Sequence, residues 1–569
     1  MIQRILGAQF ARVASAAFLI GGFSVLSRLL GLARNRIFTE EFGASQTLDV
    51  YYAAFLIPDF IYNILVIGLL SAVFIPIFSE YFHKDQKEAW HFANISLNTV
   101  IILVAGFSLV LYVLMPWILP VLVSGFSEEM KSEAVKVSRL MLLSPVFLGM
   151  SSIFGSIIQN FRKYVYYSLA PIFYNIGIIF GVIFLSFWGV YGLAIGVVLG
   201  AFLHFSIQMI GAFSSGFRYR MIFDWKHLGF LKMGRLSVAR FFSIAFSQVN
   251  AIIITAIASL LAVGSISIFN LANDIQYLPI GVIALSYAIS IFPVLSSAVA
   301  KNDKDNFFDE LFLSVRQVLF FVLPMSIILI LMSREVVVLL YGFFDTNDTL
   351  IIAAALAIFS VSIFAQSAWR ILSRAYYAVQ NTMIPFFSSA ISVIATVTFS
   401  FVFIYLFNAK GYFYDSVIWL LGLESVPTYM VVVLSLPMAF SIGEILNFIV
   451  LILMFRKSMP WSVSFGGVLA EGSKIVAASL SIIPFVLVSK WMLKPILIHD
   501  SYMSIVMGFS VASLVGAVVY CFVLWFFKSD ELNIFLNMIF SMFKKSERKK
   551  AKEELPKNIE EGLISGKES

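Results

Sequence analysis

Charged residues, cysteine and histidine are all scarce in this chain. Only 12% of its 569 residues are charged and 60% are hydrophobic, which is far beyond the apolar fraction of soluble globular proteins. The single cysteine, Cys521, excludes an internal disulfide and every metal or redox motif that needs paired cysteines. The five histidines lie too far apart for HExxH-type zinc ligation, and the glycines of the C-terminal GLISGKES are too close together for a phosphate-binding loop. We therefore expect no metal, no cofactor and no ATP hydrolysis.

Apolar segments make up most of the remaining sequence. The chain has 59 phenylalanines and a mean hydropathy of +0.94. Segments of roughly 18 to 25 apolar residues between polar residues are long enough to cross a bilayer as helices. The sequence predicts an all-α polytopic membrane protein with about fourteen transmembrane helices. They are expected near residues 13–33, 50–78, 93–115, 138–160, 165–187, 189–213, 236–260, 268–298, 311–333, 350–378, 384–406, 430–455, 470–490 and 503–527.

Lysine and arginine are distributed unevenly between the two sets of alternate loops. Of the 39 basic residues, 24 fall in the set that includes both ends of the chain and 8 in the other set. Because basic residues accumulate in cytoplasmic loops, we expect both termini in the cytoplasm. The run KKSERKKAKEELPK from Lys544 predicts a solvated tail attracted to anionic lipid, and it is no evidence for nucleic-acid binding.

Two halves of the chain resemble each other. The segment VFIPIFSEYFHKD around Pro76 matches SIFPVLSSAVAKND around Pro293, 217 residues later, and the segments that end at Pro171 and Pro385 are 214 residues apart. An offset that covers an even number of spans predicts two parallel six-helix lobes related by a pseudo-two-fold axis along the membrane normal. Chance matching among apolar segments is the alternative. The expected parts are an N-terminal lobe at 1–215, a C-terminal lobe at 216–460, two additional transmembrane helices at 461–530 and a basic tail at 531–569.

Two prolines fall at nearly corresponding places in the two halves. Pro58 and Pro279 are 221 residues apart, about one helical turn from the repeat offset. A proline removes a backbone donor and bends a helix, so we expect interruptions in the second and eighth spans. Interrupted helices at repeat-related positions point to a substrate site between the lobes.

Three arginines lie close together in the segment SRLLGLARNR. Arg28 falls inside the first expected span, Arg34 and Arg36 lie at its outer end, and Asp49 begins the second span. A charged side chain costs about 2.5–3.5 kcal/mol at mid-bilayer, so it should face a partner or a water-filled cavity. An interfacial anchor is one interpretation. Because the arginines lie on the side that the charge bias disfavours, we favour a site for an anion.

Two later spans carry polar stripes. Asn270, Asn273 and Asp274 fall on one face of the eighth span, and Arg370 and Arg374 lie one turn apart on the tenth. Interhelical hydrogen bonding is one explanation. We favour a cavity lining in which Asp274 is the counter-charge to Arg370 or Arg374.

The twelfth span carries Glu444 and, three residues later, Asn447. This spacing places both side chains on one helical face. The pair fits a structural hydrogen bond and a site for a coupling ion equally well.

The segment SRLLGLARNRIFTEEFGASQTLDVYYAAFLIPDF, followed by AVFIPIFSEY, resembles the N-terminal motif of the MurJ (MviN) lipid II flippase family. This family belongs to the multidrug/oligosaccharidyl-lipid/polysaccharide exporter superfamily. The resemblance continues through LAPIFYNIGIIFGV, GLAIGVVLGAFLHF, LANDIQYLPIGV and RAYYAVQNTMIP, and thus covers nearly the whole of the first twelve spans. It implies fourteen spans in two lobes around a central cavity that opens alternately to each side of the bacterial cytoplasmic membrane. It also implies transport of an undecaprenyl-diphosphate-linked peptidoglycan precursor to the outer leaflet.

The resemblance assigns roles to three residues. The family's cavity arginines of the first span match Arg28 and Arg34, and its acidic residue at the start of the second span matches Asp49. Three other family charges are absent, because their positions hold Tyr62 or Asn63, Ile67, and Asp274. Either Arg370 and Arg374 compensate for these charges or the substrate headgroup differs.

Three other functions compete with lipid II transport. The protein could move another polyprenyl-diphosphate-linked glycan, or it could be a multidrug antiporter, although an antiporter for cations favours an acidic cavity and the residues singled out here are net basic. A membrane glycosyltransferase would need a large outer loop with acid and base residues, whereas the outer loops have roughly 25 residues at most. The expected partners are the lipid-linked substrate, membrane lipids and a coupling ion or the membrane potential, with no nucleic acid and with the protein as a monomer.

Overall fold

The computed structural model describes residues 13–64, 71–342, 345–459, 461, 466–495 and 501–537, and this part of the chain is helical without strands. The expectation of an all-α polytopic membrane protein is confirmed. The α-helices are α2 (Val13–Phe42), α3 (Gln46–Ile61), α4 (Ser71–Lys84), α5 (Gln86–Leu122), α6 (Glu128–Met141), α7 (Leu143–Asn160), α8 (Tyr164–Leu185), α9 (Val190–Ser214), α10 (Leu228–Ser259), α11 (Ser265–Pro279), α12 (Leu285–Ala300), α13 (Lys304–Leu331), α14 (Ser333–Tyr341), α15 (Thr346–Ser360), α16 (Ile363–Ala378), α17 (Met383–Asn408), α18 (Tyr412–Leu421), α19 (Thr428–Val431), α20 (Ser435–Ser458), α21 (Gly466–Leu493) and α22 (Tyr502–Phe526). Short 3-10 and π segments are η2 (Ser186–Trp188), η3 (Ile280–Ala284) and η4 (Val432–Leu434).

Ten helical stretches of the described residues are long and apolar enough to cross a membrane, or eleven if the adjoining α15 and α16 make one span. These ten coincide with ten of the fourteen expected ranges. The other four ranges lie on α2, on α3 with α4, on α10, and on α15 with α16. In these places arginines, a break in the helix or residues outside the described part interrupt the apolar stretch.

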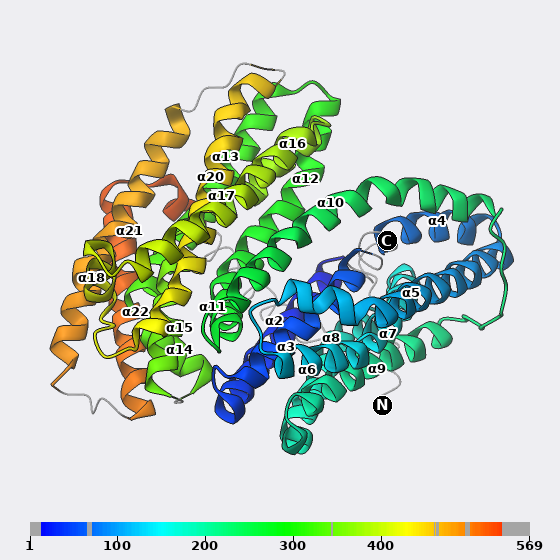
Figure 1. Ribbon diagram of the computed structural model, residues 1–569. Coiled ribbons are helices and arrows are strands. Elements are labelled where there is room, and N and C mark those ends of the chain that lie inside the picture. The colour runs from blue at the N-terminus through cyan, green and yellow to red at the C-terminus, as the bar shows by residue number, and fades with distance from the viewer. Residues whose placement is uncertain are drawn as a thin grey trace, which may run out of the picture. The chain divides into compact units, whose positions relative to one another are not determined.

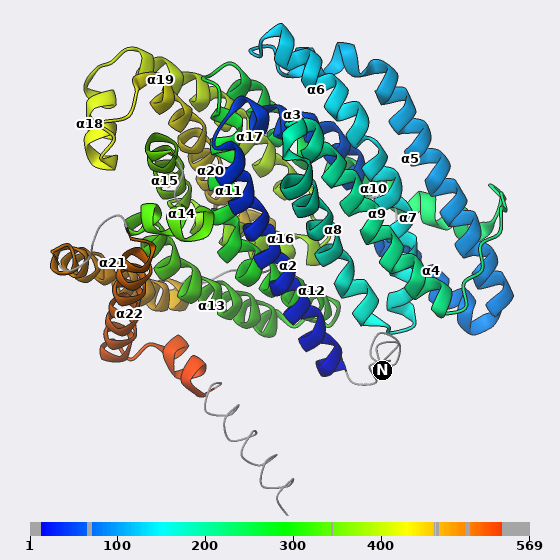
Figure 2. The same ribbon diagram turned by 90° about the horizontal axis from the view of Figure 1, so that it is seen from below.

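The chain divides into two compact units. The first comprises residues 1–278, 332–362 and 383–450, and the second comprises residues 279–331, 363–382 and 451–569. In the first unit α7, α8 and α9 pack side by side (Figure 1), and α2 runs along α8 (Figure 2). The division into two six-helix lobes and two additional helices stays a prediction.

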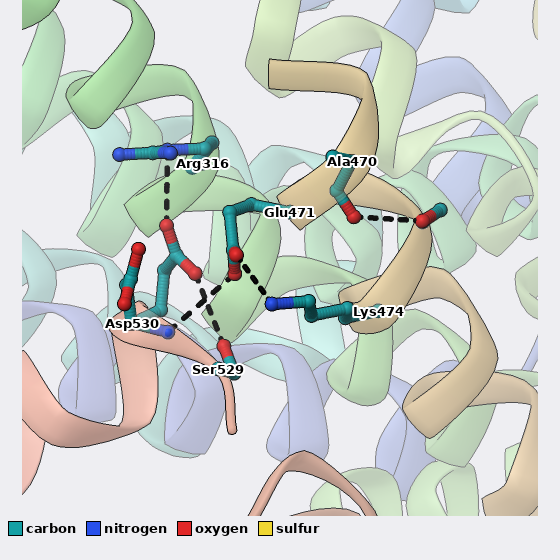
Figure 3. Close-up of polar contacts among 8 residues, drawn as sticks. Arg316, Ala470, Glu471, Lys474, Ser529 and Asp530 are labelled. Atoms are coloured by element: carbon teal, nitrogen blue, oxygen red, sulfur yellow. Dashed lines mark hydrogen bonds and ion pairs between the residues drawn. The ribbon is translucent and has the colours of Figure 1, made fainter. Parts of the chain in front are cut away.

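The second unit is built around α13. This helix packs against α12, α16 and α21, and α21 packs against α22. At one end of the unit Arg316 of α13 forms an ion pair with Glu531 at 3.0 Å, and Glu471 of α21 accepts hydrogen bonds from Lys474 and from the backbone N–H of Asp530 (Figure 3). The residues that follow α22 are thereby fastened to both α13 and α21.

The first helix is longer than the apolar pattern predicts. The expected span ends at residue 33, whereas α2 continues to Phe42 and includes both Arg34 and Arg36. Arg36 forms an ion pair with Glu40 one turn later, at 2.8 Å, which stabilises a helical turn. The helix therefore runs about nine residues past the expected end of the span, because hydropathy locates the membrane interface and not the end of a helix.

Both prolines are followed by a widened helical turn. Pro58 lies within α3, and residues 62–64 directly after α3 are π-helical. Pro279 ends α11 and is followed by the π-helical segment Ile280–Ala284. The helix continues through the turn after Pro279, and Ser265–Ala300 remains one candidate span. Such π-helical turns are frequent at functional sites.

Candidate functional site

A hydrogen-bonded chain joins α2 to α11 within the first unit. The Nε and Nη2 atoms of Arg34 donate to Asn35 Oδ1 at 3.1 and 2.9 Å, and Asn35 Nδ2 donates to Asp274 Oδ2 at 2.8 Å. The guanidinium also lies 5.5 Å from the ring centroid of Phe38. Arg34 and Asp274, two of the predicted site residues, are therefore linked through Asn35, a residue that the sequence did not single out.

The start of α11 is positioned by Asp49, which is 2% exposed. Its carboxylate accepts hydrogen bonds from the backbone N–H of Gly264 at 2.7 Å, the backbone N–H of Ser267 at 2.8 Å and the Ser267 hydroxyl at 2.9 Å. The first N–H groups of a helix lack partners within the helix, so a carboxylate here both pairs them and opposes the helix dipole. Asp49 thus fixes the end of the helix that carries Asp274.

Tyr341 of α14 holds α2 and α11 in place from the side. Its carbonyl oxygen accepts a hydrogen bond from Thr39 Oγ1 at 2.9 Å, and its hydroxyl donates to the carbonyl oxygen of Leu271 at 2.9 Å. Tyr341 is fully buried. The arginine-bearing end of α2 and the polar turn of α11 are therefore held to a single rigid neighbour.

Arg28 lines a cavity of about 600 Å³ inside the first unit. Among the described lining residues, Arg28 alone carries a fixed charge, and none is Asp or Glu. Tyr62, which together with Asn63 is a candidate for the position of one absent family arginine, also lines the cavity. The lining residues are Ile20, Phe23, Ser24, Ser27, Arg28, Tyr62, Leu148, Ser152, Gly155, Ser156, Gln159, Tyr167, Ser168, Pro171, His204 and Gln208.

The other two predicted residues of α11, Asn270 and Asn273, form side-chain hydrogen bonds within that helix. Asn270 Nδ2 donates to the carbonyl oxygen of Ile266 at 2.8 Å, and Asn273 Oδ1 accepts from Gln276 Nε2 at 2.8 Å. Of the polar stripe on this helix, Asp274 makes the hydrogen bond that reaches α2.

Arg370 and Arg374 of α16 belong to the second unit. Arg370 Nη1 donates to the carbonyl oxygen of Gln366 at 2.9 Å, and the Arg374 guanidinium lies 5.9 Å from the ring centroid of Tyr377. Their pairing with Asp274, and their compensation for the missing family charges, stay predictions.

Glu444 and Asn447 lie on α20, where α17 approaches closely. Ser392 Oγ donates to Glu444 Oε1 at 3.4 Å, and the buried Asn447 Oδ1 has no hydrogen-bond partner among the described residues. A Cβ added to Gly443 would come within 2.2 Å of Thr396 Oγ1. The contact therefore gathers several oxygen atoms, the kind of ligand that a hard cation prefers. The assignment as a coupling-ion site stays a prediction.

Asn63, the alternative to Tyr62, and Ile67 are the other residues of this region to which the resemblance assigns absent family charges. Asn63 Nδ2 donates to Asp59 Oδ2 at 2.8 Å, so its amide is engaged within one turn. Ile67 lies outside the described residues.

Comparisons with known proteins agree with one another. The family model described as "Lipid II flippase MurJ" matches residues 38–516. The chain is 29% identical over 399 residues to a protein of Thermotoga maritima named "Probable lipid II flippase MurJ", which covers 69% of this chain and 80% of the relative. It is 26% identical over 408 residues to "Lipid II flippase MurJ" of Burkholderia cenocepacia, which covers 70% of this chain and 79% of the relative.

Solved structures show the same likeness. "Lipid II flippase MurJ, inward closed conformation" has a TM-score of 0.70 and 25% identity, and it covers 90% of this chain and 98% of its own. An inward-facing multidrug resistance MATE family transporter of the MOP superfamily has a TM-score of 0.61 at 14% identity, and covers 76% of this chain and 94% of its own. The second likeness is one of fold.

Proposed function

Since this chain belongs to the lipid II flippase MurJ family, we propose that it carries lipid II from the inner to the outer leaflet by alternating access. The diphosphate of the lipid is bound by Arg28 and Arg34. The protein is a transporter and not an enzyme, and its substrate is the lipid-linked peptidoglycan precursor. Its membrane is the bacterial cytoplasmic membrane, and it acts as a monomer.

The observation that carries the proposal is the arrangement of the two arginines on α2. Arg28 lines a cavity with no carboxylate among its described lining residues, and Arg34 is held in position through Asn35. A guanidinium presents a fixed fork of donors that meets phosphate oxygens in pairs, and it stays charged at every physiological pH. Both features suit a diphosphate that must be bound without being hydrolysed.

Through Asn35, Asp274 provides an alternative to phosphate as the group that engages the Arg34 guanidinium. Without phosphate, the carboxylate engages Asn35, which accepts from the guanidinium. A diphosphate that reaches Arg34 competes with this link for the same donors. Asp274 thereby limits the affinity of the site, which a transporter needs because it must also release its cargo.

Energy for the cycle comes from a coupling ion at Glu444 and Asn447 or from the membrane potential. The oxygen atoms at the contact of α17 and α20 support a cation site. Flippases for other polyprenyl-diphosphate glycans would use the same arginines, so the exact headgroup is part of the proposal. A multidrug antiporter is disfavoured because a cationic drug would meet Arg28 without a carboxylate beside it.

The test is lipid II flipping by the full chain in vesicles. Arg28→Ala and Arg34→Ala should each reduce the flipping rate at least about tenfold, since each removes charge-assisted phosphate contacts. Arg36→Ala is the matched control, because Arg36 lies on the same helix and pairs with Glu40. It should retain most of the rate. Flipping at the wild-type rate in an Arg28→Ala, Arg34→Ala double variant would refute the anion site, and vesicles with imposed sodium, proton or potential gradients identify the driving force.

A further inference from the structure

Residues 217–227, the strap, join α9 to α10 and cross the surface of α5 without forming a helix (Figure 2). Asn98 Nδ2 of α5 donates hydrogen bonds to the carbonyl oxygens of Arg220 and Ile222 at 2.9 and 3.0 Å. One turn earlier on α5, Asn94 Oδ1 accepts from the backbone N–H of Arg220 at 2.6 Å. The strap is therefore fixed to α5 by its backbone, which leaves its side chains available for other contacts.

The strap lies at the level where the spans of the first unit meet the membrane boundary. Asn94 and Asn98, which bind it, are among the first residues of the expected span 93–115. The candidate span of α9 ends at Ser214, directly before the strap, and the expected span of α10 begins only at residue 236. The strap thus runs along the boundary between the apolar core of the bilayer and water.

Large apolar side chains of the strap and of the first turn of α10 are exposed, although they lie outside the spans. Six of them are between 42% and 79% exposed: Tyr219, Met221, Phe223, Trp225, Leu228 and Leu231. Exposed apolar side chains within a span face the acyl chains, whereas a group of them outside a span marks a contact with a protein or a membrane surface. Because side chains alternate along an extended chain, Tyr219, Met221 and Phe223 fall on one face of the strap.

Basic side chains accompany this apolar face. Arg218 and Arg220 alternate with the apolar residues, Lys226 follows them, and all three are exposed. Asp224 is the acidic residue of the strap, and its carboxylate accepts a hydrogen bond from the backbone N–H of Lys226 at 3.0 Å. Long basic side chains can keep their charged ends among lipid headgroups while their carbon chains lie along apolar surface. The strap therefore combines an apolar face with a net positive charge.

We propose that the strap binds anionic phospholipid at the membrane surface on the basic-rich side of the protein. Tyr219, Met221 and Phe223 reach into the boundary below the headgroups, and Arg218 and Arg220 pair with the phosphates. Aromatic side chains are enriched at this level of a bilayer, and each basic residue near an anionic surface adds to the attraction. Anionic lipid thereby fastens the connection between α9 and α10 to the bilayer. The inference concerns the lipids around the protein, so it goes beyond the proposed function and does not depend on the transported substrate.

The test follows one fluorescent label on the strap of the full chain in lipid nanodiscs. Met221→Cys in the Cys521→Ser background carries a nitrobenzoxadiazole group, whose emission moves to shorter wavelength when the group leaves water. The nanodiscs contain phosphatidylcholine alone or with increasing fractions of phosphatidylglycerol, so that the anionic charge of the lipid is the variable.

Two double variants of the labelled chain separate the charge of the strap from the charge of its surroundings. Arg218→Gln with Arg220→Gln removes two charges of the strap and keeps the backbone contacts with Asn98, so this variant should melt at the wild-type temperature. Lys87→Gln with Arg162→Gln is the matched control. It removes two exposed charges from other segments of the basic-rich set.

In the otherwise unchanged chain, the emission should move to shorter wavelength as the fraction of phosphatidylglycerol rises. The strap variant should need at least about fivefold more phosphatidylglycerol for half of the shift, since each basic residue contributes about that factor. The control variant should behave like the unchanged chain.

Three results would overturn the proposal. A label that stays in water at every lipid composition would leave the apolar face to a protein partner. A full shift in phosphatidylcholine alone, or an equal response of the strap variant and the unchanged chain, would show that anionic lipid is not selected. An equal loss in the strap and control variants would assign the attraction to the whole surface. None of these results bears on lipid II transport, which the flipping assay tests separately.

Discussion

Asp49 is a buried carboxylate whose three hydrogen bonds all go to the beginning of α11. The family resemblance implies that this residue contacts the substrate, whereas its geometry gives it a structural task. Asp49→Ala would leave the backbone N–H groups of Gly264 and Ser267 buried without a partner. Hydrogen bonds to charged groups contribute about 1.5–3 kcal/mol each, so we expect a loss of roughly 3 kcal/mol or more in the free energy of unfolding.

The measurement for Asp49→Ala is the melting temperature in detergent together with lipid II binding well below that temperature. A lower melting temperature with near-normal binding by the folded fraction is expected. Glu41→Ala, at an exposed position of α2, is the control and should change neither quantity. An unchanged melting temperature with lost binding would show instead that Asp49 acts on the substrate.

Single residues differ in how far the sequence reveals them. Arg28 and Arg34 could be singled out because a charge in an apolar span is costly and needs an explanation. Asn35 could not, because an uncharged side chain beside an arginine carries no comparable penalty.

At the scale of elements, the segment after α22 is held by a buried ion pair. The Glu531 side chain is 1% exposed and the Arg316 side chain 19%, with 3.0 Å between Glu531 Oε1 and Arg316 Nε. Removing one partner of a buried pair leaves the other charge uncompensated, which costs about 3–5 kcal/mol. Glu531→Ala should therefore lower the free energy of unfolding by about 3 kcal/mol, measured as a lower melting temperature.

A double variant separates the charge effect from packing. Arg316→Met with Glu531→Leu replaces both charges by apolar groups of similar size, and such replacements are often neutral or stabilising. We expect the double variant to melt near the wild-type temperature. A double variant less stable than Glu531→Ala would contradict the interpretation.

The basic tail from Lys544, which lies outside the described residues, should be dispensable for transport.

Elements could be predicted better than their ends. Ten apolar stretches were placed correctly because a bilayer needs a fixed length of apolar helix. The end of α2 was not, because the Arg36–Glu40 pair and the contacts of Thr39 with α14 extend the helix beyond its apolar part. The capping of α11 by Asp49 joins positions 215 residues apart, and no local pattern contains that information.

At the scale of the whole molecule, several segments that carry the basic-rich set of lysines and arginines contact one another within the first unit. Glu80 accepts hydrogen bonds from Lys84 at 2.9 Å and from Lys232 at 3.1 Å, which joins the end of α4 to the beginning of α10. These two lysines, Lys84 first, hold the pKa of Glu80 below its usual value. Asn94 and Asn98 of α5 donate hydrogen bonds to the backbone carbonyls of residues 218, 220 and 222, which lie between α9 and α10.

Loops of the other set meet in the same way. Asp49 binds the turn before α11, and Gly125 lies so close to the end of α10 that an added Cβ would come within 2.1 Å of the Ser259 carbonyl oxygen. In the first unit, contacts thus join segments of the same set of loops, on which the predicted orientation depends. The charge bias predicts which of the two sets faces the cytoplasm.

The single cysteine makes this orientation directly testable. In a Cys521→Ser background, Lys226→Cys places a thiol at an exposed position of the basic-rich set, and Glu424→Cys places one at an exposed position of the other. The threefold excess of lysine and arginine predicts that the first set is cytoplasmic. In intact cells made accessible to a membrane-impermeant maleimide at the outer face of the cytoplasmic membrane, Glu424→Cys should be labelled nearly completely. Lys226→Cys should react only after the membrane is permeabilised. The reverse pattern would place the termini outside. The proposed direction of lipid transport relative to the fold would then have to be reassigned.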